Sequence, residues 1–488
     1  MRSLMVVGTT SHAGKSLLCA AICRILSRQG YRVTPFKGQN MALNAYVTAE
    51  GKEMGHAQAV QAWAAKTTPR VEMNPILLKP MGDMTSQVII QGQAVGKVNA
   101  ADYYKDYFDR GWQAICESLD YLTNHFDFIV CEGAGSPAEI NLKHRDLTNM
   151  RVAKYLNAPT LLVVDIDRGG AFAHVVGTLA LLEPEERQLI KAVAINKFRG
   201  QRSLLDSGVT WLEDYTKIPV AGVIPWINRL FPAEDSLDLL DRRSRKTGAE
   251  LTIGVLHLPR IANFTDFDAL EAEPTVNLKY IKPNESLAGV DALIIPGSKT
   301  TIPDLLYLQQ SGITQEIPEF IKSGGTLLGI CGGFQMLGES VSDVEGIEGE
   351  PATVSGLGLL PLSTRISSEK VTRQRVVTAT YPSLETPITG YEIHQGKTVI
   401  SENCSYISLF NEPNLGIVDP SSSVWGTYLH GIFDNGAWRR SWLNSIRAKR
   451  QLPPLMIAVP NYQEQREEML DFIADFVTSH LDLTHLLT

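Results

Sequence analysis

The chain has 488 residues, of which 44% are hydrophobic and 20% are charged, and its net charge at neutral pH is −8. This length is more than one hydrophobic core usually holds, so two or three domains are expected. The acidic balance and the lack of a basic tract argue against a general nucleic-acid-binding protein. Six cysteines are too few for a disulfide framework. No apolar run reaches the roughly 18 residues of a membrane span, so we expect no membrane partner.

Residues 1–232 are predicted to form an α/β domain built on a mostly parallel sheet. Short apolar runs alternate with helix-length segments, and these runs are at 4–8, 32–37, 127–135, 160–167, 191–198 and 219–225. Strands so uniformly rich in Val, Ile and Leu are buried on both faces, which is typical of a parallel sheet with helices on both sides. The charged stretch 233–250 lacks a long apolar run and is predicted to be a linker.

A second α/β domain is predicted for residues 251–440. Apolar runs at 252–259, 292–298 and 326–331 indicate another mostly parallel sheet with helices on both faces. Residues 441–488 are predicted to be a helical extension whose apolar face packs against another part of the protein. The first ten residues, MRSLMVVGTT, enter a strand directly and leave no room for a signal peptide. A cytoplasmic location is therefore expected.

The stretch GTTSHAGKS, residues 8–16, follows the first strand and opens a helix, which is typical of a phosphate-binding loop. The residues predicted to bind the nucleotide here are Gly8, Thr9, Gly14, Lys15 and Ser16. Lys15 would contact the outer phosphates of ATP, and Ser16 would hold Mg²⁺. Glu132 follows another strand and is the second expected Mg²⁺ ligand, because the carboxyl ends of parallel strands meet at one crevice. The alternative is a glycine-rich turn that only joins strand to helix.

A cysteine among four glycines ends the strand 326–331 in the stretch TLLGICGGFQMLG. Glycines on both sides allow the sharp strand-to-helix turn that exposes a nucleophile, so Cys331 is the candidate nucleophile. His430 in GTYLHGIF, at a predicted strand end, is the candidate base. The backbone N–H groups of Gly297 and Gly332 are the candidate oxyanion donors. Taken singly, Cys331 and His430 are each compatible with an ordinary core residue.

Two sets of motifs resemble known families. GICGGFQMLG together with GTYLHG resembles the class I glutamine amidotransferases, and GTTSHAGKS together with EGAGSP resembles the dethiobiotin-synthetase type of phosphate loop. Their order in one chain, with the stretches PFKGQNMALNAYVT, GHAQAVQAWAA, DIDRGGAFA and INKFRG, resembles the cobyric acid synthase family over nearly the whole length. The resemblance implies that glutamine supplies ammonia, and that ATP and Mg²⁺ activate carboxylates of a corrinoid substrate for amidation.

The resemblance also implies further site residues. Lys37 would help neutralise phosphate charge, and Asn196 would hold adenine. The residues suited to binding the corrin are Gln39, Asn40, Asn44 and, as a candidate for placing substrate or metal, Asp146. For the three amides in this set, hydrogen bonds to their own loop backbone are an equally good explanation.

One departure and two alternative functions stay open. Many class I amidotransferases have an acid two residues after the catalytic histidine, where this chain has Ile432. The group that orients His430 is therefore not identified, although Glu392 is possible. The alternative activities are synthesis of cobyrinic acid a,c-diamide, or a phosphate-loop switch protein that uses an inert amidotransferase-like module for binding. The oligomeric state stays undetermined.

Overall fold

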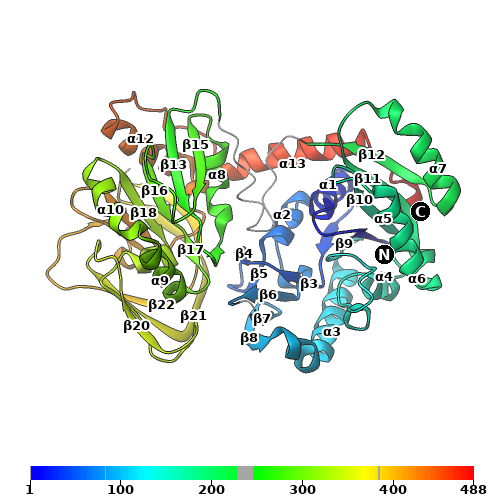
Figure 1. The fold of residues 1–488 in the computed structure, drawn as a ribbon, viewed down its shortest axis with the longest axis horizontal. Coiled ribbons are helices and arrows are strands. Elements are labelled where there is room, and N and C mark those ends of the chain that lie inside the picture. The colour runs from blue at the N-terminus through cyan, green and yellow to red at the C-terminus, as the bar shows by residue number, and fades with distance from the viewer. Residues whose placement is uncertain (1, 83, 228–245, 383–384, 488) are drawn as a thin grey trace.

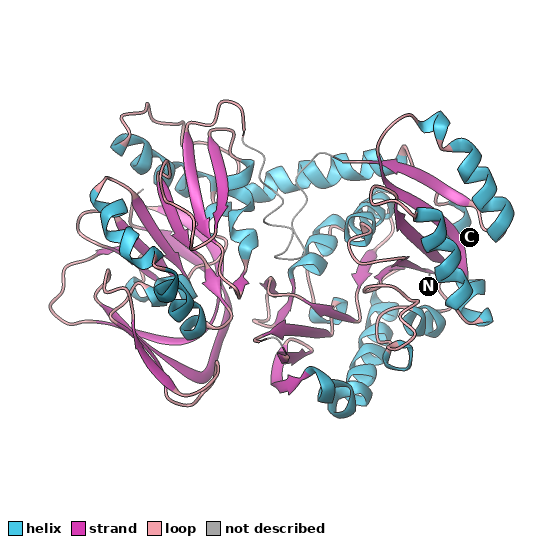
Figure 2. Cartoon of the chain, viewed as in Figure 1, coloured by secondary structure: helices cyan, strands magenta, loops and turns pink. Residues whose placement is uncertain are grey.

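Two α/β bodies stand side by side in the computed structural model, which describes residues 2–82, 84–227, 246–382 and 385–487 (Figure 1). The predicted linker 233–250 falls mostly outside these residues. The predicted fold class is confirmed, because each body has a mostly parallel sheet with helices against it (Figure 2). Within the described part of the chain, every helix is too short or too polar to cross a bilayer.

The first body has a six-stranded parallel sheet in the order β12-β11-β10-β1-β9-β2. Its strands are β1 (Arg2–Gly8), β2 (Val33–Phe36), β9 (Phe128–Glu132), β10 (Thr160–Asp165), β11 (Ile190–Phe198) and β12 (Val220–Pro225). Alternate residues of β1 enter different cores: Leu4 packs with helix α1 on one face, and Met5 packs with helix α3 on the other. Burial on both faces explains why these strands are apolar throughout.

Helices cover both faces of this sheet. They are α1 (Lys15–Arg28), α2 (His56–Ala64), α3 (Ala100–His125), α4 (Met150–Leu156), α5 (Ala171–Leu181), α6 (Pro184–Leu189) and α7 (Asp206–Thr216). Gly14 precedes α1 with a φ of 97°, a left-handed conformation that favours glycine. The phosphate-loop sequence therefore turns directly from β1 into α1.

A second, smaller sheet interrupts this body between β2 and α3, and sequence analysis did not predict it. Its order is β3-β6-β7-β8, and a separate hairpin joins β4 to β5. The strands are β3 (Gln39–Met41), β4 (Ala45–Val47), β5 (Glu53–Gly55), β6 (Ile76–Pro80), β7 (Thr85–Ile90) and β8 (Gln93–Asn99). The insertion faces the second body (Figure 1).

The second body has a seven-stranded sheet in the order β15-β13-β16-β18-β25-β24-β23, parallel from β15 to β25. These strands are β13 (Leu251–Leu256), β15 (Val276–Ile281), β16 (Ala292–Ile295), β18 (Thr326–Ile330), β23 (Ile407–Ser408), β24 (Gly416–Val418) and β25 (Val424–Thr427). The helices are α8 (Asp268–Ala272), α9 (Thr301–Ser311), α10 (Ile313–Lys322), α11 (Gly332–Met336) and α12 (Gly436–Lys449).

An antiparallel hairpin extends this body beyond the predicted parallel sheet. The long strands β21 (Leu362–Ala379) and β22 (Thr386–Ile400) form it, and β19 (Ser340–Asp343) and β20 (Ala352–Ser355) complete a four-stranded sheet. The short strands β14 (Ile261–Ala262) and β17 (Gly297–Ser298) pair with each other. Sequence analysis did not predict this hairpin, because its apolar residues are sparse and irregularly spaced, so they give neither a continuous apolar run nor a regular alternation.

The last helix, α13 (Tyr462–Thr478), leaves the second body and packs on the first (Figure 1). Its buried residues Leu470 and Ile473 belong to the same core as α1 and β1. Arg24 of α1 is fully buried and binds Glu467 at 2.7 Å and Asp471 at 3.1 Å. The predicted amphipathic helix is therefore confirmed, and its partner is the first body.

Candidate active sites

The carboxylate of Glu132 is the centre of the phosphate-loop site. Ser16 Oγ donates to its Oε1 at 2.8 Å, and Lys37 Nζ lies 3.0 Å from the same oxygen. Gln61 Nε2 of α2 donates to Oε2 at 2.5 Å. The predicted convergence of Glu132 with the phosphate loop is thus present, and Lys37 lies at the same carboxylate. Gln61 was not predicted, although it lies in the stretch GHAQAVQAWAA.

The phosphate loop is held in shape by backbone carbonyls and by Asn196. Lys15 Nζ donates to Thr10 O at 3.1 Å and to Gly135 O at 3.2 Å. Asn196 Nδ2 donates to Ala13 O at 2.8 Å. A Cβ on Gly14 would lie 2.1 Å from that amide nitrogen, so only glycine fits there. Asn196 is therefore beside the loop, and its contact with adenine stays a prediction.

The three amides expected to bind the corrin contact three different parts of the protein. Tyr103 Oη donates to Gln39 Oε1 at 2.6 Å, and Asn40 Nδ2 donates to Gln58 Oε1 at 3.1 Å. The Oδ1 atom of Asn44 accepts the backbone N–H of Phe264 in the second body at 2.8 Å. These contacts tie the amides to protein groups, and substrate binding by them stays a prediction.

Asp146 holds the turn that leads into α4. Its Oδ1 accepts the backbone N–H groups of Thr148 at 2.9 Å and Asn149 at 2.8 Å, and its Oδ2 accepts that of Arg151 at 3.1 Å. Three N–H donors occupy this carboxylate, which is a sufficient structural reason for an acid at this position. A role for Asp146 in placing substrate or metal stays a prediction.

Cys331 lies on a strained turn between β18 and α11. Its φ of 53° and ψ of −106° are unusual for a residue other than glycine. The flanking glycines allow this turn to lie against neighbouring backbone, since a Cβ on Gly333 would be 2.0 Å from Ile295 O and one on Gly329 would be 2.6 Å from Gly333. The sulfur is at the start of a short helix, as a nucleophile elbow requires.

His430 is bound on both sides of its buried ring. Its Nδ1 lies 2.7 Å from Asp266 Oδ2, and its Nε2 lies 3.3 Å from Asn263 Nδ2. Burial opposes protonation of the ring, but the charges of Asp266 and Cys331 outweigh it and raise the pKa of His430 to about 10. Asp266, in the 3₁₀ helix η5 (Phe264–Phe267), is the orienting acid that sequence analysis did not identify.

Glu392, the acid considered for that role, lies elsewhere. It binds Arg373 Nε at 2.5 Å and lies 3.3 Å from His394 Nε2. Sequence offered no signal for Asp266, because its position relative to His430 depends on how two distant loops meet.

One cavity of about 50 Å³ brings the predicted amidotransferase residues together. Cys331, His430 and Gly297 all line it, as does Gln335 of α11. A Cβ on Gly332 would lie 2.9 Å from Ser298 N, so the two predicted oxyanion segments are in contact. The donor role of Gly297 and Gly332 stays a prediction.

The first body contributes Lys79 to the wall of the same cavity. Lys79 Nζ lies 2.6 Å from Glu53 Oε1, while Lys370 of β21 binds the other oxygen of Glu53. Burial alone would raise the pKa of Glu53, but the charges of Lys370 and Lys79 lower it to about 2. A buried ion cluster therefore joins the two bodies beside Cys331.

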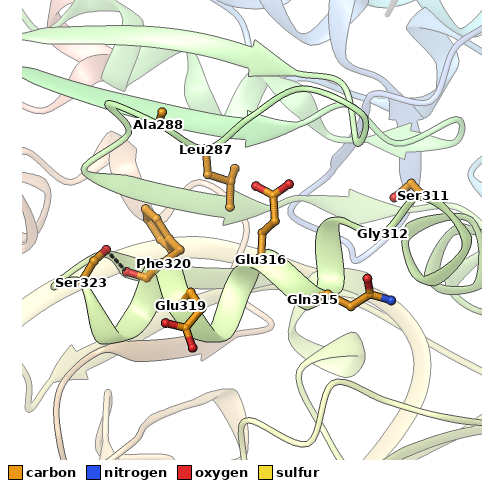
Figure 3. A pocket seen from close by; sticks show the side chains of 9 residues that line it. All are labelled: Leu287, Ala288, Ser311, Gly312, Gln315, Glu316, Glu319, Phe320 and Ser323. Carbon is orange, nitrogen blue, oxygen red and sulfur yellow. Dashed lines mark hydrogen bonds between the residues drawn. The ribbon is translucent and has the colours of Figure 1, made fainter.

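A separate hollow of about 640 Å³ lies between α10 and the segment 287–288. Leu287 and Phe320 form its apolar part, and Glu316 and Glu319 line it from α10 (Figure 3). None of its lining residues belongs to either candidate active site.

Comparison with known proteins identifies the family of this chain. A family model described as "CobB/CobQ-like glutamine amidotransferase domain" matches residues 252–438, and one described as "AAA domain" matches residues 2–234. A cobyric acid synthase of Trichormus variabilis is 66% identical, with 99% of each chain covered. The chain belongs to the cobyric acid synthase family. Family members from Nostoc sp. and Synechococcus elongatus are 65% and 62% identical, each over 100% of this chain and at least 99% of their own.

Proposed function

We propose that this protein uses ATP and glutamine to amidate the b, d, e and g carboxylates of adenosylcobyrinic acid a,c-diamide, giving adenosylcobyric acid. The full-length similarity to cobyric acid synthases supports this substrate. The observation that carries the proposal is the contact of Asp266 with His430 in the cavity lined by Cys331. That arrangement serves to release ammonia from an amide, and the same chain holds a phosphate loop. ATP and free glutamine are cytosolic, so the cytoplasm is the proposed location.

The amidotransferase half releases ammonia from glutamine. The Cys331 sulfur attacks the side-chain amide carbon while the thiol proton passes to His430 Nε2. Asp266 stabilises the resulting imidazolium at Nδ1. His430 then returns the proton to the departing nitrogen, ammonia leaves, and water hydrolyses the thioester to glutamate. In this proposal, the N–H groups of Gly297 and Gly332 stabilise the oxyanion.

The phosphate-loop half activates the corrin. A carboxylate oxygen attacks the γ-phosphorus of ATP and ADP leaves, forming an acyl phosphate. Ammonia then attacks the acyl carbon, phosphate leaves, and the nitrogen loses a proton. Lys15 and Lys37 neutralise the charge on the transferred group. In this proposal, ammonia made inside the protein reaches the acyl phosphate without mixing with bulk water and so stays unprotonated until it reacts.

The residues at Glu132 also fit Mg²⁺. A hydroxyl and a carboxylate oxygen lie 2.8 Å apart between Ser16 and Glu132, and such hard oxygen donors suit this ion. Among the described residues no cluster of three His, Cys, Asp or Glu side chains is arranged to hold a metal. Ser16 and Glu132 would therefore hold the ion together with ATP phosphates, where it would neutralise phosphate charge.

Mass spectrometry of the corrinoid tests this function. Adenosylcobyrinic acid a,c-diamide, incubated with the protein, ATP, Mg²⁺ and glutamine, should show four successive mass decreases as hydroxyl is replaced by amino. Cobyrinic acid is the competing substrate, and its conversion to the a,c-diamide would instead support the alternative ligase activity. Absence of glutamine hydrolysis with substrate present would favour the binding module.

A further inference from the structure

A series of hydrogen bonds joins residues 44–45 of the first body to His430 of the second. Asn44 Oδ1 accepts the N–H of Phe264, and the neighbouring Ala45 N–H donates to Asn263 Oδ1 at 3.0 Å. Asn263 Nδ2 then lies 3.3 Å from His430 Nε2. Asn44 and Asn263 are both buried, so water does not compete for these bonds.

The contact from Ala45 fixes which atom of Asn263 faces the histidine. A backbone N–H can only donate, so the amide oxygen points to Ala45 and the NH₂ group points to His430. His430 Nε2 must then accept a hydrogen bond through its lone pair. That lone pair is the one that has to receive the proton of Cys331. Cys331 is also hydrogen-bonded to His430, so Asn263 competes with it for this lone pair and opposes the proton transfer that starts glutamine hydrolysis.

The environment of His430 otherwise favours that transfer. The charges of Asp266 and Cys331 raise the pKa of the ring, whereas an NH₂ group directed at Nε2 disfavours the protonated form. A protonated ring would place two N–H groups against each other. The ring therefore takes up the proton of Cys331 only when Asn263 has turned away from Nε2, and Asp266 and the Cys331 thiolate then stabilise the imidazolium.

We propose that Asn263 couples the two active sites by occupying His430 Nε2 while segment 44–45 is seated against it, and by releasing Nε2 when that segment moves. This inference rests on the proposed function. Segment 44–45 follows Lys37 and Asn40 closely in the chain. Lys37 binds Glu132 in the phosphate-loop site, and Asn40 binds Gln58 of α2. Nucleotide and corrin bound there would displace the segment, so glutamine is hydrolysed when an acceptor is in place. Asn263 is a positioning residue, because it acts through His430.

Release of glutamate from glutamine, without and with ATP and adenosylcobyrinic acid a,c-diamide, tests the coupling. The wild type should be stimulated by the two ligands. Asn263→Ala should raise the unstimulated kcat about 5- to 150-fold, the usual range of such couplings, with little change in KM, and should lose most of the stimulation. An unchanged or lower kcat, or stimulation equal to that of the wild type, would overturn the proposal.

Two further variants keep the test decisive. Gln374→Ala is the matched control. Gln374 of the second body also contacts the β4–β5 hairpin, because its Nε2 donates to Tyr46 Oη and Val47 O at 2.9 Å, but it does not contact His430. This variant should keep wild-type stimulation. If Asn263→Ala also loses amidation with added ammonia, which would indicate misfolding, Asn44→Ala decides: it should raise unstimulated glutaminase, and failure to do so overturns the coupling. The comparison of unstimulated glutaminase needs no corrinoid, so it stands even if the corrin assignment fails.

Discussion

Asp266 Oδ2 lies 2.7 Å from His430 Nδ1, although 164 positions separate the two residues in the chain. The other oxygen of Asp266 accepts the backbone N–H of Gly431 at 2.8 Å. The carboxylate therefore fixes both the ring and the turn that carries it. This contact completes a Cys–His–Asp arrangement in which the acid precedes both of its partners in sequence.

Replacing Asp266 tests that arrangement. Asp266→Asn should lower the kcat of glutamine hydrolysis by about 10²- to 10⁴-fold, because the amide does not stabilise the imidazolium and can select the wrong tautomer. Amidation with added ammonia should stay at the wild-type rate. Glutamate release measured beside ammonia-driven amidation separates the two effects, and an unaffected glutaminase would exclude Asp266 from the mechanism.

Cys331→Ala should remove the use of glutamine altogether while sparing amidation with added ammonia. The nucleophile is needed only to free nitrogen from glutamine, whereas the phosphate-loop site can accept ammonia from solution. The corrinoid product, assayed with each nitrogen source in turn, provides the measurement. Equal loss with both sources would contradict the division of labour between the two bodies.

Lys15→Ala should have the reciprocal effect. Loss of the ammonium group beside the phosphates should reduce amidation with either nitrogen source by at least about 10²-fold, while unstimulated glutaminase persists. Lys191→Ala, an exposed lysine on β11, is the control and should leave both activities unchanged. Loss of basal glutaminase in Lys15→Ala would show that the two sites cannot be separated in this way.

Glu53→Gln should destabilise the protein by about 3–5 kcal/mol at neutral pH, because the buried Lys79 and the half-buried Lys370 lose their counter-ion. The pKa of Glu53 falls from 4.5 to about 2 on folding. Its stabilisation is therefore complete above about pH 4.5 and is lost as the pH falls toward 2. The difference in the free energy of unfolding between wild type and variant, measured with urea, should become smaller below pH 4.5. Glu50 is an exposed acid near Glu53 in the chain, and Glu50→Gln should have nearly the same free energy of unfolding as the wild type. A difference between Glu53→Gln and the wild type that does not change with pH would refute the ion cluster.

Leu470→Ala should destabilise the first body by about 2–5 kcal/mol, since it leaves a cavity between α13 and α1. Leu470 is 1% exposed in that core. Glu468→Ala, on the exposed face of the same helix, should cost less than about 0.5 kcal/mol. Denaturant unfolding followed through the phosphate-loop body measures both, and equal costs would show that α13 contributes little to this core.

Sequence patterns predicted the parts of this fold that local chemistry determines. The parallel strands of both sheets follow from continuous apolar runs, and the strained turn at Cys331 follows from its glycines. The insertion β3–β8 and the hairpin β21–β22 were not predicted, because their short or half-exposed strands give weak periodicity. Asp266 and Asn263 were missed for another reason. Their roles depend on tertiary contacts with His430 and Ala45, which no local pattern encodes.

The position of α13 also bears on how the protein is made. Leu470 and Ile473 complete a core whose other members come from α1 and β1, at the opposite end of the chain. A nascent chain on the ribosome therefore exposes the apolar surface of α1 until α13 has been translated. The core of the first body is therefore completed only after the second body has been synthesised. Until then, its uncovered apolar surface is accessible to chaperones.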